Sequence, residues 1–457
     1  MKVLLVMPLA LPAYLFQLAA LSAFLKSKGH VVRYEELLIN GDIHTKHLER
    51  LGRVISEFSP DIIGFSSYEM SFNWIRRLSE HIKKISPEVP IVVGGYYASL
   101  CPEEVIRCPS IDIVCIGEGE YPLLELLDSL SSQGLRKQID NLWFKEGGRI
   151  IKNPLRNLIS ELDDLPFVDR ESFSSDNRKK GILEIMASRG CPFDCTNCSN
   201  HALKKIYAGK GAYVRHRSVE NVLKEISWCL ESDDFKAIHF EDDMFSANQS
   251  WLRDFCYKYK TEIGLPFVCN IRPDSGSSEV LNLLKESGCI QISIGLEAGD
   301  EKMRCRVLGR DIPNQALIQV FRDSKRIGLL RKSFNMVGLP YETLLTLWRT
   351  IWMNLKLAPD AVQTSVYYPF KGTALGDECY RNGWVDLKRK ERLSLYANDT
   401  ILNLPGVSRS LIRMAKWLNS ATALRSGNLS LIKTGIVTFA KHLKSSFRSN
   451  RDRQEKC

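Results

Sequence analysis

Short apolar stretches alternate with longer amphipathic segments over the first 135 residues. The apolar stretches are rich in Val, Ile and Leu, and residues 72–85 have the spacing of a helix. Buried strands that alternate with helices are typical of a doubly wound parallel sheet. The pattern therefore predicts an α/β domain over residues 1–135. Its strands are expected at 3–7, 31–35, 62–66, 91–93 and 113–116.

The uncharged stretch at residues 3–25 is long enough to raise the question of a signal peptide or a membrane-spanning helix. Pro8 and Pro12 lie inside it, and proline breaks a spanning helix. We therefore expect a buried strand, a loop at 8–12 and a helix at 14–28. No later apolar run is long enough to span a bilayer.

A second alternating series begins near residue 183, after a connector at 136–180 that contains a glycine hairpin at 141–151. Six strand–helix units in fewer than 200 residues predict a barrel, or part of one, over 181–375. Such barrels carry their active sites at the carboxyl ends of the strands. The region 376–457 is expected to be helical. The strands are expected at 183–188, 237–241, 267–271, 291–295, 332–337 and 362–368.

The loops that follow the strands of the first domain are rich in Gly, Ser and Pro. Doubly wound sheets bind ligands at this edge, and small residues let the backbone approach a bulky ligand. Any one of these loops taken alone is most simply interpreted as a tight turn. Four such loops at one edge of the sheet favour a binding site for a large cofactor. The candidate contacts are Pro8, Ser66, Ser67, Gly94, Gly95, Tyr96, Gly117, Glu118, Gly119 and Glu120.

Three cysteines, Cys191, Cys195 and Cys198, fall within eight residues directly after an expected strand. Thiolates at this spacing can bind three irons of one cubane cluster and leave the fourth iron open. A zinc site is the alternative, with His201 as the nearest fourth ligand. An odd total of 13 cysteines without repeated spacing argues against a secreted disulfide framework.

The cysteine motif resembles the CxxxCxxC signature of radical S-adenosylmethionine (SAM) enzymes. The amino-terminal region resembles the cobalamin-binding domain fused to one branch of that superfamily. The likeness covers residues 1–375. It implies a flavodoxin-like cobalamin-binding domain at 1–135, a linker with a hairpin at 136–180 and a partial (β/α)6 radical SAM barrel at 181–375. The matching stretches of the first domain are 61–67, 92–98, 102–103 and 112–120.

The resemblance implies a [4Fe-4S] cluster on the three cysteines, with SAM bound at the open iron through its amino and carboxylate groups. Reduction would release a 5′-deoxyadenosyl radical. Acidic side chains suit the ammonium group of SAM, and an arginine suits its carboxylate or ribose. Each acidic residue taken alone could also be a solvated loop carboxylate. The expected SAM-binding residues are Phe193, Glu241, Asp242, Asp243, Arg272 and Glu297.

The chain departs from the family pattern at two places. Asn197 stands before the third cysteine, where an aromatic residue often packs near the adenine, so Phe193 or Tyr213 would supply that contact. Some cobalamin proteins ligate cobalt through the histidine of a DxHxxG motif. Asp42 and His44 begin such a motif, but no glycine follows. We therefore expect a surface role for His44 and a lower face of cobalt that is open or water-bound.

The resemblance favours a methyltransferase that uses the radical and methylcobalamin to methylate an unactivated carbon or phosphorus centre of a small molecule, lipid or peptide. A cyclase, ring-contraction or oxidative enzyme with the same cofactors is the alternative. A non-catalytic corrinoid or iron–sulfur carrier would need a coordinatively complete cluster. An electron donor such as flavodoxin or ferredoxin is implied. Reduced cysteines and oxygen-sensitive chemistry predict a cytoplasmic protein.

Most of the net charge of +10 belongs to the carboxyl-terminal end. Residues 411–457 carry ten Lys and Arg against Asp452 and Glu455, which leaves both cofactor regions nearly neutral. Whole-chain charge is therefore no evidence for nucleic acid. Residues 431–447 mix apolar and basic side chains and could form an amphipathic helix against a membrane surface or an anionic substrate. A solvated basic helix is the alternative.

Overall fold

The computed structural model describes residues 1–10, 15–39, 41–132, 136–173, 176–392 and 399–422. These residues belong to two compact units. The first contains Met1–Asp242, Phe370–Asp377 and Leu387–Leu395, and the second contains the rest. Residues 423–457, with the amphipathic helix expected at 431–447, lie outside the described part of the chain.

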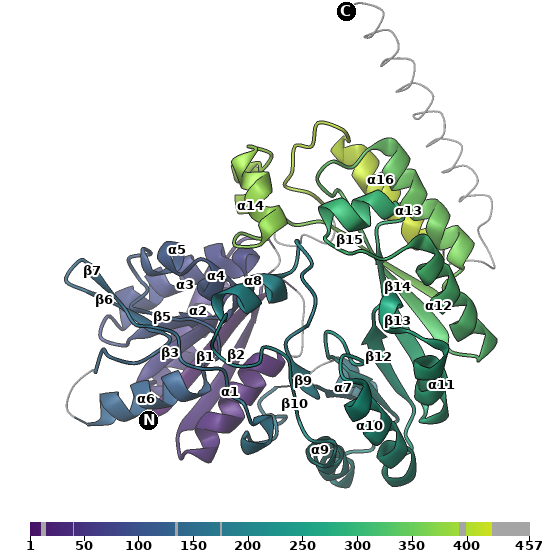
Figure 1. The fold of residues 1–457 in the computed structure, drawn as a ribbon. Coiled ribbons are helices and arrows are strands. Elements are labelled where there is room, and N and C mark those ends of the chain that lie inside the picture. The colour runs from purple at the N-terminus through teal and green to yellow at the C-terminus, as the bar shows by residue number, and fades with distance from the viewer. Residues whose placement is uncertain (11–14, 40, 133–135, 174–175, 393–398, 423–457) are drawn as a thin grey trace, which may run out of the picture. The chain divides into compact units, whose positions relative to one another are not determined.

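In the described residues, the first sheet has seven strands in the order β2-β1-β3-β4-β5-β6-β7 (Figure 1). The first five strands are parallel, which confirms the predicted doubly wound sheet. The hairpin that the sequence assigned to the connector forms β6 and β7 and extends this sheet in the antiparallel direction. The strands are β1 (Lys2–Leu9), β2 (Val31–Leu38), β3 (Ile62–Ser66), β4 (Ile91–Gly94), β5 (Ile113–Cys115), β6 (Leu142–Glu146) and β7 (Arg149–Lys152).

Helices cover both faces of the first sheet, which explains why its strands are apolar on both sides. Leu4 and Val6 of β1 pack in one core with α2 to α5, whereas Val3 and Leu5 pack in the other with α1 and α6. The helices are α1 (Phe16–Ser27), α2 (Thr45–Phe58), α3 (Phe72–Ile85), α4 (Gly95–Leu100), α5 (Pro102–Ile106) and α6 (Glu120–Ser131), with a short 3-10 turn η1 (Glu69–Ser71). The connector contains η2 (Leu162–Asp164) and α7 (Asp176–Lys179).

The second sheet has, in the described residues, six strands in the order β15-β14-β13-β12-β11-β8. Every strand pairing recorded within it is parallel, which confirms the predicted half-barrel of strand–helix units. The strands are β8 (Ile182–Ile185), β11 (Ala237–Phe240), β12 (Phe267–Ile271), β13 (Cys289–Glu297), β14 (Leu330–Val337) and β15 (Ala361–Val366). A separate antiparallel pair consists of β9 (Ser188–Arg189) and β10 (Arg215–His216).

The first barrel strand is shorter than the sequence predicted, because β8 ends at Ile185 rather than at residue 188. The N–H of Ala187 donates to the Asp242 carboxylate at 3.1 and 3.0 Å instead of continuing the strand ladder.

The helices of this region are α8 (Ser199–Ile206), α9 (Val219–Ser232), α10 (Gln249–Glu262), α11 (Ser278–Glu286), α12 (Asn314–Arg326) and α13 (Leu344–Leu357), with shorter turns η3 (Pro273–Ser275) and η4 (Met303–Val307). Three more helices, α14 (Ala374–Arg381), α15 (Leu387–Arg392) and α16 (Arg409–Ala421), follow the last strand.

A buried hydrogen-bond network fixes α13 and α16 on the outer face of β14 and β15. The Asn354 amide of α13 donates to Asn335 at 2.7 Å and to Asn419 of α16 at 2.9 Å. The Asn419 amide donates to the Thr364 hydroxyl of β15 at 2.9 Å. Buried amides with satisfied partners specify one register of packing. No helix among the described residues has the length and apolar character needed to cross a membrane.

Candidate functional site

The cysteine loop connects β9 to α8. Gly190 has φ +85°, and a Cβ there would lie 2.3 Å from the Tyr213 carbonyl oxygen, so only glycine fits this turn. Cys195 is buried, whereas Cys191 and Cys198 are partly exposed. The Cys198 N–H donates to the Cys195 carbonyl at 3.1 Å. Cys198 itself directly precedes α8. The positive end of a helix stabilises a thiolate at this position.

Asp242 supports the strand that leads into the cysteine loop. It is 1% exposed, and its carboxylate accepts hydrogen bonds from the Ala187 N–H and the Ser188 hydroxyl. The Leu375 N–H donates to the Thr196 carbonyl at 3.0 Å and holds the loop from its other side. The sequence assigned Asp242 to SAM, but the contacts of its carboxylate give it a structural role, so its SAM contact stays a prediction without support.

Two carboxylates and one ring of the predicted SAM set are accessible. Glu241 follows β11, and its Oε1 lies 2.7 Å from the His239 Nδ1. Asp243 is exposed, and Phe193 is partly exposed within the cysteine loop. Sequence reasoning did not single out His239, because a lone histidine in a strand gives no motif.

In the described residues, no three His, Cys, Asp or Glu side chains are grouped to hold one metal ion. Each cysteine of a cubane cluster binds a different iron, so the three thiols do not have to meet around one metal ion.

The second unit brings Arg272 and Glu297 together at the carboxyl ends of β12 and β13. Burial raises the pKa of the Glu297 carboxyl, although Arg310 and Arg272 act in the opposite direction. Arg310 also donates to the Gly295 carbonyl at 3.0 Å. Glu297 has φ +61° beside an irregularity in the strand ladder, and such strained backbone is common at functional sites. Arg272 is 2.8 Å from Asp274. The sequence missed Arg310, which lies outside any strand-end motif.

The loops at the carboxyl ends of β3 and β4 are locked together by small residues. Gly95 has φ +90°, and a Cβ there would lie 2.6 Å from the Ser67 backbone nitrogen. The Ser67 hydroxyl donates to the Gly94 carbonyl at 2.7 Å, and Ser67 is fully buried. Ser66 and Tyr96 remain partly exposed. Gly94, Gly95 and Ser67 therefore bring backbone to this edge beside the partly exposed Tyr96, and small residues of this kind let a macrocycle such as cobalamin approach the backbone.

The other predicted contacts on the first sheet, apart from Glu120, differ in how far the fold itself fills their surroundings. Pro8 is buried within β1. Gly117 has φ +77°, and the Tyr207 hydroxyl occupies the space that a Cβ would need, 1.6 Å away. The Glu118 N–H donates to that same hydroxyl at 3.0 Å. The neighbouring Gly119 has no close contact of this kind, since the nearest atom to its Cβ position is 3.7 Å away.

A buried ion-pair cluster joins the loop after β5 to the segment that precedes the cysteine loop. We call it the carboxylate bridge, and it consists of Glu118, Glu120, Arg189 and Arg215. Arg189 donates to Glu118 at 3.0 Å and to Glu120 at 2.6 Å. Arg215 donates to both oxygens of Glu118, at 3.1 and 2.9 Å. Burial alone would raise the pKa of Glu118, but Arg189 and Arg215 hold it below its ordinary value. The structure thus uses both predicted cobalamin carboxylates within the protein.

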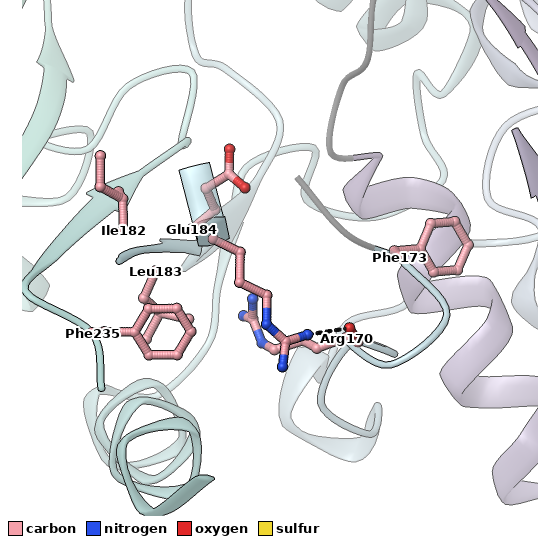
Figure 2. Close-up of a pocket in the computed structure, with 7 residues that line it drawn as sticks. Arg170, Phe173, Ile182, Leu183, Glu184 and Phe235 are labelled. Carbon is pink, nitrogen blue, oxygen red and sulfur yellow. Dashed lines mark hydrogen bonds between the residues drawn. The ribbon is translucent and has the colours of Figure 1, made fainter. Parts of the chain in front are cut away.

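A small pocket that is partly open to solvent lies elsewhere in the first unit (Figure 2). Its arginines, Arg170 and Arg178, pair with Glu225 at 2.8 Å and Asp233 at 2.6 Å. Its lining includes Ile182, the first residue of β8, whereas the cysteine loop follows the carboxyl end of that strand. The pocket is therefore not the candidate site. The remaining lining residues are Phe173, Leu183, Glu184 and Phe235.

Glu342, after β14, has a buried carboxyl group, and its burial predicts how the free energy of unfolding changes with pH. Burial raises its pKa from 4.5 to about 8, although the N–H groups of Gly338 and Leu339 donate to its Oε2. Between these pH values the folded chain keeps a proton that the unfolded chain has lost. The free energy of unfolding should therefore fall as pH rises, by up to about 1.4 kcal/mol per pH unit.

The variant Glu342→Gln keeps the acceptor oxygen and cannot ionise. We expect the free energy of unfolding of this variant, measured in urea between pH 5 and 8, to fall less steeply with pH than that of the unsubstituted protein. Identical slopes for the variant and the unsubstituted protein would contradict the buried, protonated state of Glu342.

Comparisons with known proteins agree with both halves of the structure. Residues 6–127 match the B12 binding domain family, and residues 185–351 match the radical SAM superfamily. A protein described as an uncharacterized methyltransferase from Pyrococcus horikoshii is 30% identical over 352 residues, which cover 76% of this chain and 75% of that protein. Cytidylyl-2-hydroxyethylphosphonate methyltransferase of Streptomyces wedmorensis is 22% identical and covers 78% and 73%.

A solved structure shares the fold. The radical SAM methyltransferase TsrM from Kitasatospora setae, solved with cobalamin and a [4Fe-4S] cluster bound, superposes with a TM-score of 0.69. It is 19% identical and covers 83% of this chain and 75% of its own. With the sequence relative and the two matched domains, these findings show that the chain belongs to the family of radical SAM enzymes that carry a B12-binding domain.

Proposed function

We propose that this chain is a cobalamin-dependent radical SAM methyltransferase that methylates an unactivated carbon or phosphorus centre. The observation that carries the proposal is the carboxylate bridge, in which Arg189 contacts Glu118 at 3.0 Å two residues before Cys191. The loop after β5 and the cysteine loop, which we propose to hold the corrin and the cluster, belong to the same compact unit, and the bridge joins them within it. Two-cofactor chemistry needs such fixed placement, because the protein contributes mainly binding and orientation.

The cluster, SAM and cobalamin would together supply a carbon radical and a transferable methyl group. The protein's own residues would position them. Cys191, Cys195 and Cys198 would bind three irons, and Cys198 stands directly before the amino-terminal end of α8. The Glu241 carboxylate would accept from the ammonium group of SAM, and Arg272 would donate to its carboxylate or ribose. The glycine edge at Gly94 and Gly95 would let the corrin approach the backbone.

The names of the relatives support methyl transfer over the alternatives. The Pyrococcus and Streptomyces relatives are both described as methyltransferases. A second candidate is cyclisation, because anaerobic magnesium-protoporphyrin IX monomethyl ester cyclase of Rubrivivax gelatinosus is 23% identical over 79% of this chain. We further propose a flavodoxin or ferredoxin as electron donor and a small molecule, lipid or peptide as substrate.

The experiment separates methyl transfer from cyclisation without requiring the substrate. The protein would be reconstituted anaerobically with iron, sulfide and cobalamin, reduced, and given SAM. A methyltransferase should convert SAM to S-adenosylhomocysteine only when cobalamin is loaded, as measured by liquid chromatography and mass spectrometry. The same protein reconstituted without cobalamin is the control. Formation of 5′-deoxyadenosine without S-adenosylhomocysteine in the cobalamin-loaded protein would rule out the methyltransferase.

A further inference from the structure

The solvent side of α13 and α16 carries an unusual group of exposed apolar side chains. On α13, Leu345, Trp352 and Leu355 are 41%, 46% and 37% exposed. On α16, Trp417 is 51% exposed. Their spacing on α13 places three large side chains along one stripe of the helix. We call this surface the α13–α16 face.

The two tryptophans belong to the same face because the buried amides align the helices. Asn354 and Asn419 contact each other at 2.9 Å on the core side. Each tryptophan stands two residues before one of these asparagines, which is about 200° around the helix and about 3 Å along its axis. Trp352 and Trp417 therefore lie at nearly the same level of the helix pair, on the side opposite the core.

The charged side chains that belong to α13 and α16 are all basic. Neither α13 nor α16 contains Asp or Glu, and together they carry Arg349, Lys356, Arg409, Arg413 and Lys416. The Lys356 Nζ lies 5.1 Å from the centre of the Trp352 ring. Arg349 pairs with Asp300, and Arg413 lies 3.8 Å from Asp399, so these two arginines contribute less to the field of the face.

We propose that the α13–α16 face docks on an anionic lipid membrane. Exposed tryptophan surrounded by Lys and Arg is the composition of helices that lie at a membrane surface, where indole rings sit between headgroups and acyl chains. Basic side chains are attracted to anionic headgroups within a Debye length. Interfaces between proteins, in contrast, are depleted of lysine at their centres. The inference goes beyond the proposed function, because it concerns where the enzyme acts and holds whichever reaction it catalyses.

The test uses the full chain and sedimentation with lipid vesicles. Vesicles of phosphatidylcholine alone would be compared with vesicles that contain one third phosphatidylglycerol. We expect the protein to sediment with the anionic vesicles, to bind neutral vesicles at least tenfold more weakly, and to dissociate as salt is raised. The double variant Trp352→Ser, Trp417→Ser should lose at least tenfold in affinity for anionic vesicles.

Trp228→Ser is the matched control, because Trp228 is 48% exposed on α9 of the first unit. Its vesicle binding should equal that of the unsubstituted protein. Lys356→Glu tests the charge of the face and should weaken binding without removing an apolar side chain. Absence of binding by the unsubstituted protein would overturn the proposal, as would full binding by the double variant. A dimer in light scattering that the double variant converts to monomer, without vesicle binding, would instead assign the face to a second copy of the chain.

Discussion

Replacing Cys198 with alanine is expected to abolish the formation of 5′-deoxyadenosine while cobalamin binding is retained. Cys198 stands directly before α8 and is one of three cysteines in a loop that the structure fixes through Gly190 and Asp242. Loss of one thiolate leaves two protein ligands for a cluster that needs three. The predicted cobalamin contacts after β3 and β4 are held by hydrogen bonds of Ser67 that do not involve the cysteine side chains.

The measurement combines chromatography of 5′-deoxyadenosine with the absorption spectrum of bound cobalamin. Cys305→Ala is the matched control, because Cys305 is an exposed cysteine outside the loop and its removal leaves no cavity. The control should form 5′-deoxyadenosine at the unsubstituted rate. Continued formation by the Cys198→Ala variant would show that the cluster assignment is wrong.

Breaking the carboxylate bridge is expected to have the largest effect on stability. Arg189→Met removes the arginine of Glu120, whose side chain is 6% exposed, and one of the two arginines of Glu118, which keeps Arg215. A buried carboxylate that loses its cation costs about 3 kcal/mol or more of unfolding free energy. Arg189→Lys should recover only part of this loss, because a single ammonium group does not reproduce the guanidinium fork that reaches two carboxylates.

The measurement is urea unfolding of each variant. The double variant Arg189→Met, Glu120→Gln serves as the matched comparison, since it removes the carboxylate that loses its arginine and keeps the pair between Glu118 and Arg215. It should be more stable than Arg189→Met alone, which would reveal the coupling. Because the pKa of Glu118 is lowered in the folded chain, its contribution should be present at neutral pH and lost as pH falls below its ordinary value of 4.5. Equal stability of Arg189→Met and the unsubstituted protein would refute the bridge.

The sequence predicted the features that depend on local pattern. The strand–helix alternation, the small-residue loops and the clustered cysteines are all visible within short windows. Gly95 and Gly190 are examples, since each has a positive φ and a neighbour that excludes a Cβ. The strand ends that carry Arg272 and Glu297 follow from the same alternation.

The features that depend on distant contacts could not be predicted. Arg189 meets Glu120 across 69 residues of chain, and Arg215 meets Glu118 across 97. The sequence therefore interpreted Glu118 and Glu120 as ligand contacts, although their partners are arginines of the same chain. The same limit applies to Asp242, whose carboxylate accepts from the Ala187 N–H across 55 residues of chain, and to the hairpin that joins the first sheet.

Electron paramagnetic resonance of the reduced, reconstituted protein with and without SAM tests the central claim most directly. The claim is that one chain holds cobalamin together with a three-cysteine cluster whose fourth iron is open to SAM. We predict one cobalamin and one [4Fe-4S] cluster per chain, and a change in the g values of the reduced cluster when SAM is added. A cluster spectrum that SAM leaves unchanged, in protein loaded with both cofactors, would contradict the account.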